Sequence, residues 1–191
     1  MNNYIDKTQN ILYLGYIFLI VLGIINETLF YSQFGINILE YSDILDVLIS
    51  PISKLSSNVS LLIISSFVIL ILIAVPKMSR KLKDKKWFTS FLKLDPSETK
   101  IEKKVFEGLT VFSIIFFIGI FVGAGHGKGL NLKQKIESGE VKYNNQINFI
   151  DGELLDAKLI GKNSSYVFYL IEGDTEVKIS PINGTIKYLS N

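Results

Sequence analysis

VSLLIISSFVILILIAVPKMSRKLKDKK, residues 59–86, decides the fold class of this 191-residue chain. Its apolar part, Val59 to Val75, approaches the roughly 20 residues that a helix needs to cross a bilayer. Two further stretches have the same character, at about 11–29 and 105–125. The sequence therefore predicts three transmembrane helices. A cleavable signal peptide is the alternative for the first stretch, and the lack of a small-x-small cleavage site before Glu27 argues against it.

The charges of the connections predict how these helices are oriented. Loop 76–104 is strongly basic, whereas connection 26–58 is acidic. Because short loops rich in Lys and Arg remain in the cytoplasm, we expect this loop and the N-terminus inside the cell and the C-terminal region outside. Lysines beside a membrane helix also contact anionic lipid, and we favour that explanation over nucleic-acid binding. The basic residues are Lys77, Arg80, Lys81, Lys83, Lys85, Lys86, Lys93, Lys100, Lys103 and Lys104, against Asp84, Asp95, Glu98 and Glu102.

Residues 41–56 predict a short amphipathic helix on the outer side of the membrane. Apolar residues recur at helical spacing, while Asp43 and Asp46 suit the positive N-terminal end. We expect Ser42 to cap the helix and Pro51 to interrupt it. Such a helix is too short to span, so it is interfacial or re-entrant. A fourth crossing is the alternative, and it would change the side on which the C-terminal region lies.

Composition excludes several kinds of chemistry. The chain has no Cys and one His, which rules out disulfides, thiolate nucleophiles and cysteine-rich metal sites. Its 20 basic and 18 acidic residues give a nearly neutral chain. We expect no catalytic residues, no metal and no cofactor, because no nucleophile is paired with a base and no cofactor loop is present.

The glycine-rich stretch GIFVGAGHGKG, residues 119–129, does not match a phosphate-binding loop. A P-loop needs G-x-x-x-x-G-K-[ST], and here Gly129 occupies the place of the hydroxyl residue. Glycines repeated every four residues instead predict close helix packing inside a membrane. The expected packing residues are Gly119, Gly123 and Gly127, with Ser65 and Ser66 of the second span as partners. A contact between two copies of the chain is the alternative.

We expect the third span to end among the following glycines, since Gly125, Gly127 and Gly129 weaken a helix. Residues 126–145 then form a linker with a short helix. Two ionisable residues, Glu27 and His126, lie near the ends of predicted spans and form the candidate polar membrane site. An interfacial carboxylate and a solvated imidazole are the favoured interpretations.

The last part of the chain, 146–191, predicts a small antiparallel β-domain. Apolar and polar residues alternate in short runs that are separated by turn residues such as Asn183-Gly184. Residues 165–172 are apolar on both faces, which indicates the central strand. This pattern fits a barrel-like domain of the SH3 or Sm type. The expected strands are 146–150, 154–162, 165–172, 175–180 and 185–189.

The chain is thus expected to be an α+β membrane protein, with a transmembrane region at 1–125, the linker at 126–145 and the β-domain at 146–191. The segments FYSQFGINILEYSDILDVL (30–48) and AKLIGKNSSYVFYLIEGDTEVKISPINGTIKYL (157–189) resemble parts of small bacterial multi-pass membrane proteins without an assigned activity. The resemblance implies this architecture in a bacterial cytoplasmic membrane, and no site residues.

For function, the sequence favours a non-catalytic component that interacts, senses or scaffolds through an exposed β-domain. The expected partners are the lipid bilayer, an unidentified protein and a second copy of the chain, without nucleic acid. The alternative is a subunit of a small oligomeric channel or transporter. A membrane enzyme ranks third, and it would require Glu27 or His126 to be essential.

Overall fold

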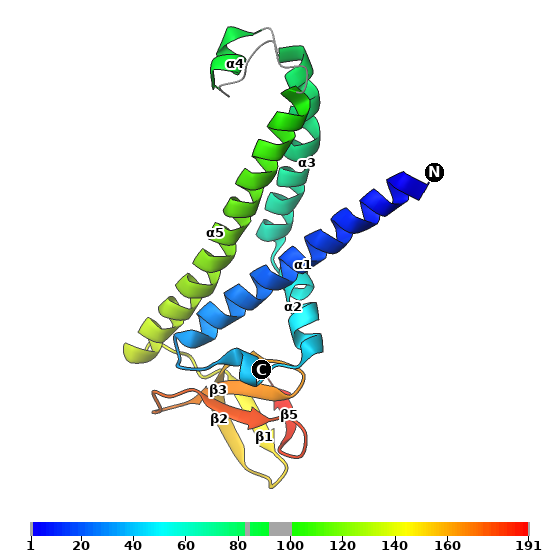
Figure 1. Cartoon of the computed structure of the whole chain (residues 1–191). Coiled ribbons are helices and arrows are strands. Elements are labelled where there is room, and N and C mark those ends of the chain that lie inside the picture. The colour runs from blue at the N-terminus through cyan, green and yellow to red at the C-terminus, as the bar shows by residue number, and fades with distance from the viewer. Residues whose placement is uncertain (1, 83–84, 92–100, 191) are drawn as a thin grey trace. The chain divides into compact units, whose positions relative to one another are not determined.

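The computed structural model describes residues 2–82, 85–91 and 101–190, which form helices and a five-stranded antiparallel sheet (Figure 1). The helices are α1 (Asn2–Ser32), the 3-10 helix η1 (Ile38–Glu40), α2 (Ile44–Ser57), α3 (Val59–Leu82), α4 (Lys86–Phe91) and α5 (Ile101–Glu137). The strands are β1 (Asn145–Phe149), β2 (Leu154–Lys162), β3 (Tyr166–Ile171), β4 (Lys178–Pro181) and β5 (Ile186–Ser190). Of the basic loop, Lys83, Asp84, Lys93, Asp95, Glu98 and Lys100 lie outside the described residues.

Three of these helices are long and apolar enough to cross a membrane. The qualifying segments are Leu12–Ser32 in α1, Val59–Ser79 in α3 and Ile101–Glu137 in α5. Each contains one of the three predicted spans almost entirely, which supports a membrane protein. The packing divides the chain into two units, Met1–Ile52 with Phe121–Asn191, and Ser53–Ile120. The sheet therefore belongs to the same unit as α1.

Helix α5 is longer than the sequence predicts. It continues through Gly125, Gly127 and Gly129 to Glu137, so the helix does not end among these glycines as expected, and the short helix expected within the 126–145 linker is part of α5 rather than separate. The physical reason is packing against α1. A side chain at Gly125 or Gly129 would collide with the backbone of α1, and this close contact outweighs the low helix propensity of glycine.

Helix α2 also differs in its details. It continues through Pro51 to Ser57, whereas the sequence predicts an interruption at the proline. The ring of Pro51 is buried beside Gly23 of α1, where the missing side chain leaves room for it. The predicted cap is wrong as well, because the Ser42 hydroxyl donates to the Ile38 carbonyl instead. Asp43 precedes the helix, and its N–H donates to the Asp46 carboxylate as in a capping box.

The five strands form an open sheet in the order β4-β3-β2-β1-β5. All four pairings are antiparallel, and β2 carries a register shift between Leu159 and Gly161. The strands coincide with the predicted runs to within a few residues, but the central strand is β2 rather than β3, so that prediction is wrong. No ladder joins β4 to β5 among the described residues, so the sheet is not closed and a barrel is not confirmed.

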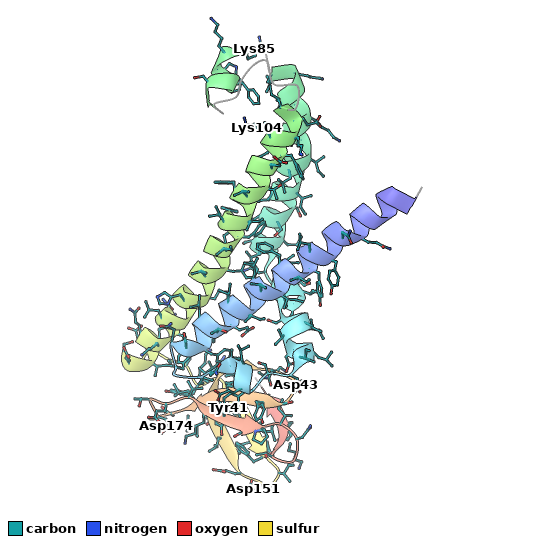
Figure 2. The ribbon with its side chains drawn as sticks, viewed as in Figure 1. Tyr41, Asp43, Lys85, Lys104, Asp151 and Asp174 are labelled. Atoms are coloured by element: carbon teal, nitrogen blue, oxygen red, sulfur yellow. The ribbon has the colours of Figure 1, made fainter. Side chains whose placement is uncertain are left out.

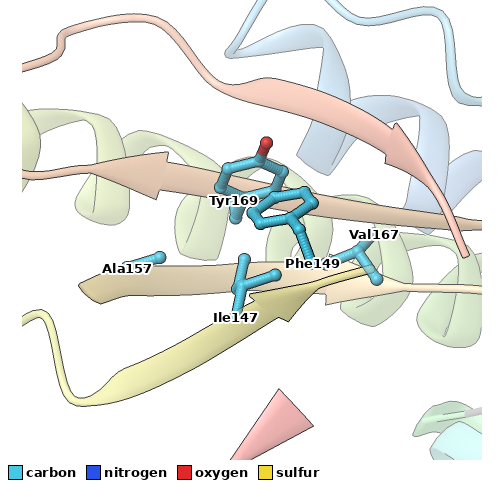
Figure 3. Packing of buried hydrophobic residues seen from close by; sticks show 5 residues of the cluster. All are labelled: Ile147, Phe149, Ala157, Val167 and Tyr169. Carbon is cyan, nitrogen blue, oxygen red and sulfur yellow. The ribbon is translucent and has the colours of Figure 1, made fainter. Parts of the chain in front are cut away.

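One face of the sheet carries its own hydrophobic core, shown in Figure 3. Ile147 and Ala157 are completely buried there, although the core consists only of residues from the sheet and its turns. Since strands of a flat sheet would leave that face in water, the sheet must curve around these side chains. The five buried residues are Ile147, Phe149, Ala157, Val167 and Tyr169.

The second unit has a small cluster of its own. Phe88 of α4 is buried with Ile101 and Val105 of α5, and Val75 and Leu82 of α3 pack against them. This cluster joins the three helices beside the basic loop.

Candidate functional site

The other face of the sheet packs against the end of α1 and the segment that follows it. Phe168 of β3 is fully buried, and its ring centre lies 4.8 Å from that of Tyr31. Tyr41 approaches Phe168 and Tyr166 edge to face, at 6.0 and 5.4 Å. Gly161 of β2 is necessary here, because a side chain at this position would overlap the Tyr31 ring. The sheet is therefore docked on α1 through a cluster of aromatic rings.

Hydrogen bonds to residues at the start of α2 also hold the sheet in its docked position. The Ser164 hydroxyl donates to Asp46 Oδ2 at 2.8 Å, and the Ser164 N–H donates to Asp46 Oδ1 at 3.1 Å. The Ser165 hydroxyl donates to Asp43 Oδ2 at 3.0 Å, and Asn163 Nδ2 donates to the Tyr41 carbonyl at 2.8 Å. We call this set of contacts the clasp; Tyr41 and Asp43 are labelled beside the sheet in Figure 2. The clasp fixes the β2–β3 turn to the N-terminus of α2.

A glycine contact joins α1 to α5. A methyl group at Gly125 would lie 2.5 Å from the Asn26 carbonyl oxygen, and one at Gly129 would lie 2.8 Å from that of Phe30. Beside them, the buried Asn26 amide donates to the Phe121 carbonyl at 2.8 Å. Small residues spaced by four let two helices approach closely, as expected inside a membrane.

The predicted glycine stripe is not the one that makes this contact. A methyl group at Gly119, Gly123 or Gly127 would meet no described atom within 4 Å. Of the predicted partners, Ser66 donates its hydroxyl to the Leu62 carbonyl of its own helix. Gly125 and Gly129 are offset from the predicted stripe by two residues, or about 200° around a helix, so the close packing with α1 uses roughly the opposite side of α5. The contact between two copies remains a prediction.

Helix α2 crosses α1 through three contacts (Figure 1). The Tyr16 hydroxyl donates to the Leu48 carbonyl at 3.0 Å. The Ser50 hydroxyl donates to Glu27 Oε1 at 3.0 Å. Pro51 packs on Gly23, as described above. These contacts place the middle of α2 against the middle of the apolar segment of α1.

The two residues of the candidate polar membrane site have different neighbours. Glu27 is partly buried and accepts its hydrogen bond from α2, whereas His126 Nδ1 lies 3.3 Å from Gln33 Nε2 at the end of α1. His126 is exposed. Each of them thus contacts a different segment of the chain.

Half of the docked face of the sheet remains uncovered. Residues directly opposite one another on β2, β1 and β5 form two rows, and we call them the open patch: Gln146, Asn148, Leu154, Asp156 and Tyr188. Leu154 and Tyr188 are half exposed, at 51% and 52%. Gln146 donates to Asp156 at 3.0 Å, and Asn148 donates to Tyr188 Oη at 3.3 Å. An aromatic ring and an aliphatic side chain framed by amides are able to bind another protein surface.

Sequence reasoning missed the docking and the clasp, although one signal was present. Residues 165–172 are apolar on both faces, which requires a packing partner on each. The partner is the segment from Phe30 to Tyr41, more than a hundred positions earlier in the chain.

In the part of the chain that the structure describes, no group of three or more His, Asp or Glu side chains is placed to hold a metal ion. No protein-family model matches the chain, and the comparisons found neither a similar curated protein nor a similar solved structure.

Proposed function

We propose that the chain is an integral protein of a bacterial cytoplasmic membrane whose sheet acts as a non-catalytic binding or sensing module. One observation carries this proposal: a single sheet face is divided between a docked half and the open patch. The docked half holds Tyr31 at the end of α1, while the open patch presents Leu154 and Tyr188 to a partner. A partner on the open patch therefore acts on the same rigid sheet that holds the membrane helix.

The orientation belongs to the proposal. The basic residues after Pro76 support a cytoplasmic loop and N-terminus, contact of the loop with anionic lipid, and a β-domain outside the cytoplasm. The chain has no cysteine, so single cysteines at Lys81 and Lys162 are clean reporters. Both positions are exposed. Labelling of intact cells with an impermeant maleimide is expected at 162 alone; labelling at 81 alone would invert the orientation.

Binding is tested by placing a photo-crosslinking amino acid at Tyr188 or Leu154 in living cells. We expect the same protein adduct from both positions. Lys178 on the opposite edge strand is the matched control and should not give it. An Asn148→Arg variant, which fills the open patch with a charged side chain, should abolish the adduct. Identical adducts from all three positions, or none from 154 and 188, would contradict the proposal.

We further propose that the sheet is a partly open barrel of the small SH3-like type. Its two edge strands, β4 and β5, are joined only by residues 182–185. The Ile186 N–H donates back to the Ile182 carbonyl at 3.1 Å, so this connection is a tight turn. Edges of a flat five-stranded sheet would be about 19 Å apart at the usual strand spacing, which a tight turn of four residues cannot bridge. The short connection between β4 and β5 therefore supports edge strands that converge.

A second candidate function is a subunit of an oligomeric channel or transporter. The observation in its favour is the unoccupied glycine face at Gly119, Gly123 and Gly127, which suits a second copy. Light scattering of the detergent-solubilised protein separates the two functions, since a monomer would contradict the oligomeric candidate.

A further inference from the structure

The apolar face of α2 has no partner in the described structure. Leu45, Ile49 and Ile52 share one side of the helix, and they are 63%, 59% and 51% exposed. Ile44 beside them is 76% exposed. An apolar side of this size is unfavourable in water.

The polar side chains of α2 that precede Pro51 are bonded to other parts of the chain. Between Ile44 and Ile52 the only polar side chains are those of Asp46 and Ser50. Asp46 is bonded to the sheet through the clasp, and Ser50 is bonded to Glu27 of α1. A helix lying on the membrane surface shows a polar side to water, and residues 44–52 of α2 have no polar side chain that is not already bonded within the chain; the exposed serines of α2, Ser53, Ser56 and Ser57, follow Pro51.

The contacts with α1 define how deep α2 lies. Gly23, which receives Pro51, is about 13 Å from the end of the apolar segment at Ser32, given a helical rise of about 1.5 Å per residue. The hydrocarbon core is about 30 Å thick, so Gly23 of a membrane-spanning α1 lies near its middle. Counted along α2 itself, Pro51 is about 12 Å from Asp43, which the clasp holds at the sheet. The distance from the sheet to this contact is therefore about the same along both helices, about 13 Å along α1 and about 12 Å along α2.

The backbone of α2 is disturbed at Pro51, and one carbonyl of the preceding turn has a partner on α1. A proline inside a helix disturbs the hydrogen bonds of the preceding turn, which is costly in hydrocarbon unless another group compensates. The Tyr16 hydroxyl donates to the Leu48 carbonyl in that turn.

We propose that α2 is inserted into the bilayer beside α1, with Leu45, Ile49 and Ile52 in contact with lipid acyl chains. The Leu14, Ile17 and Val21 side chains of α1, whose segment is long and apolar enough to span, are exposed as well. The inserted helix begins at the clasp, so the β-domain sits directly on the membrane surface. The proposal does not depend on whether the open patch binds a partner.

Spin labels on single cysteines test this depth in the full-length protein. Ile49→Cys is the test position, Leu14→Cys the reference for hydrocarbon and Lys162→Cys the reference for water, all at exposed sites. The protein is reconstituted in vesicles of phosphatidylcholine and phosphatidylglycerol, and label relaxation is measured with oxygen and with a water-soluble nickel complex.

We expect the nickel complex to relax the label at position 49 as weakly as at position 14, and several-fold less than at position 162. Oxygen should show the reverse order. A label at 49 that matches 162, or that lies midway between the references as on a surface helix, would overturn the proposal. A label at 14 that matches 162 would overturn it too, because α1 would then not cross the bilayer.

Discussion

The molecule has two kinds of surface, those that pack on α1 and those that α1 leaves uncovered. Both are built from the same kinds of residue. On α5, Gly125 and Gly129 touch the α1 backbone, whereas Gly123 and Gly127 meet no described atom. On one face of the sheet, Phe168 is fully buried against Tyr31, while Tyr188 remains half exposed. Residue type therefore does not distinguish the two surfaces; the neighbours that the fold brings to them do.

The largest loss of stability is expected from a substitution at Phe168. Phe168→Ala removes a fully buried ring and should destabilise the protein by about 3–5 kcal/mol, the usual cost of a large cavity. For a chain of this size that corresponds to a fall in Tm of roughly 10 °C. The measurement is a thermal scan of the detergent-solubilised protein.

Tyr188→Ala is the matched control on the open surface. It removes a half-exposed ring and one hydrogen bond, so its Tm should change by a small fraction of that seen for Phe168→Ala. Equal losses for the two variants would show that the open patch is covered, and would remove the distinction between the surfaces.

The glycines of α5 give the next largest effect, and with opposite signs. Gly125→Ala places a methyl group against the Asn26 backbone and should destabilise by about 1–3 kcal/mol, as in other overpacked sites. Gly123→Ala meets open space and should stabilise the helix by up to about 1 kcal/mol, since alanine is the better helix former. Thermal scans of the two variants side by side measure both. A gain at position 125 would mean that the α1–α5 contact is looser than the structure has it.

These pairs also show what a sequence can and cannot predict. The apolar runs predict the three candidate spans, and the alternation of Leu155, Ala157 and Leu159 predicts β2, because both signals are local. The choice between Gly123 and Gly125 is not local. Both lie in the same glycine-rich stretch, and only the position of Asn26 on α1 selects the second.

The clasp could not be predicted from the sequence either, because its contacts are not local. Asp43 and Asp46 match the N-terminus of a helix, and Ser164 and Ser165 match a turn, so each pair is fully explained by its own surroundings. Their contact exists only because Phe168 docks on Tyr31 and brings the turn to α2.

A smaller effect is expected from the clasp itself. Ser164→Ala removes its hydroxyl bonds to Asp43 and Asp46 and should cost about 0.5–1.5 kcal/mol, with the backbone bond to Asp46 retained. Hydrogen exchange is the sharper measurement, because the amides of Ser165 and Tyr166 in the turn should exchange faster. Ser138→Ala, which removes an exposed bond within α5, should leave these amides unchanged. Unaltered exchange in Ser164→Ala would show that the aromatic cluster alone holds the turn.

The smallest effect is expected at Lys178, an exposed residue of the β4 edge that lies outside the open patch. Its ammonium group lies 2.8 Å from Asp174 Oδ2, and this hydrogen bond raises the pKa of Lys178 above the ordinary value for lysine. A raised pKa in the folded state means that the pair stabilises the fold at neutral pH, and that this contribution disappears as the pH rises through the folded-state pKa. Because both groups are exposed, water screens the pair, and Asp174→Asn should hardly change Tm. The same substitution should lower the pKa of Lys178, measured from the NMR shift of the carbon next to Nζ. A marked fall in Tm for Asp174→Asn would show that this exposed pair stabilises the fold as much as a packed contact does, and would contradict the screening by water.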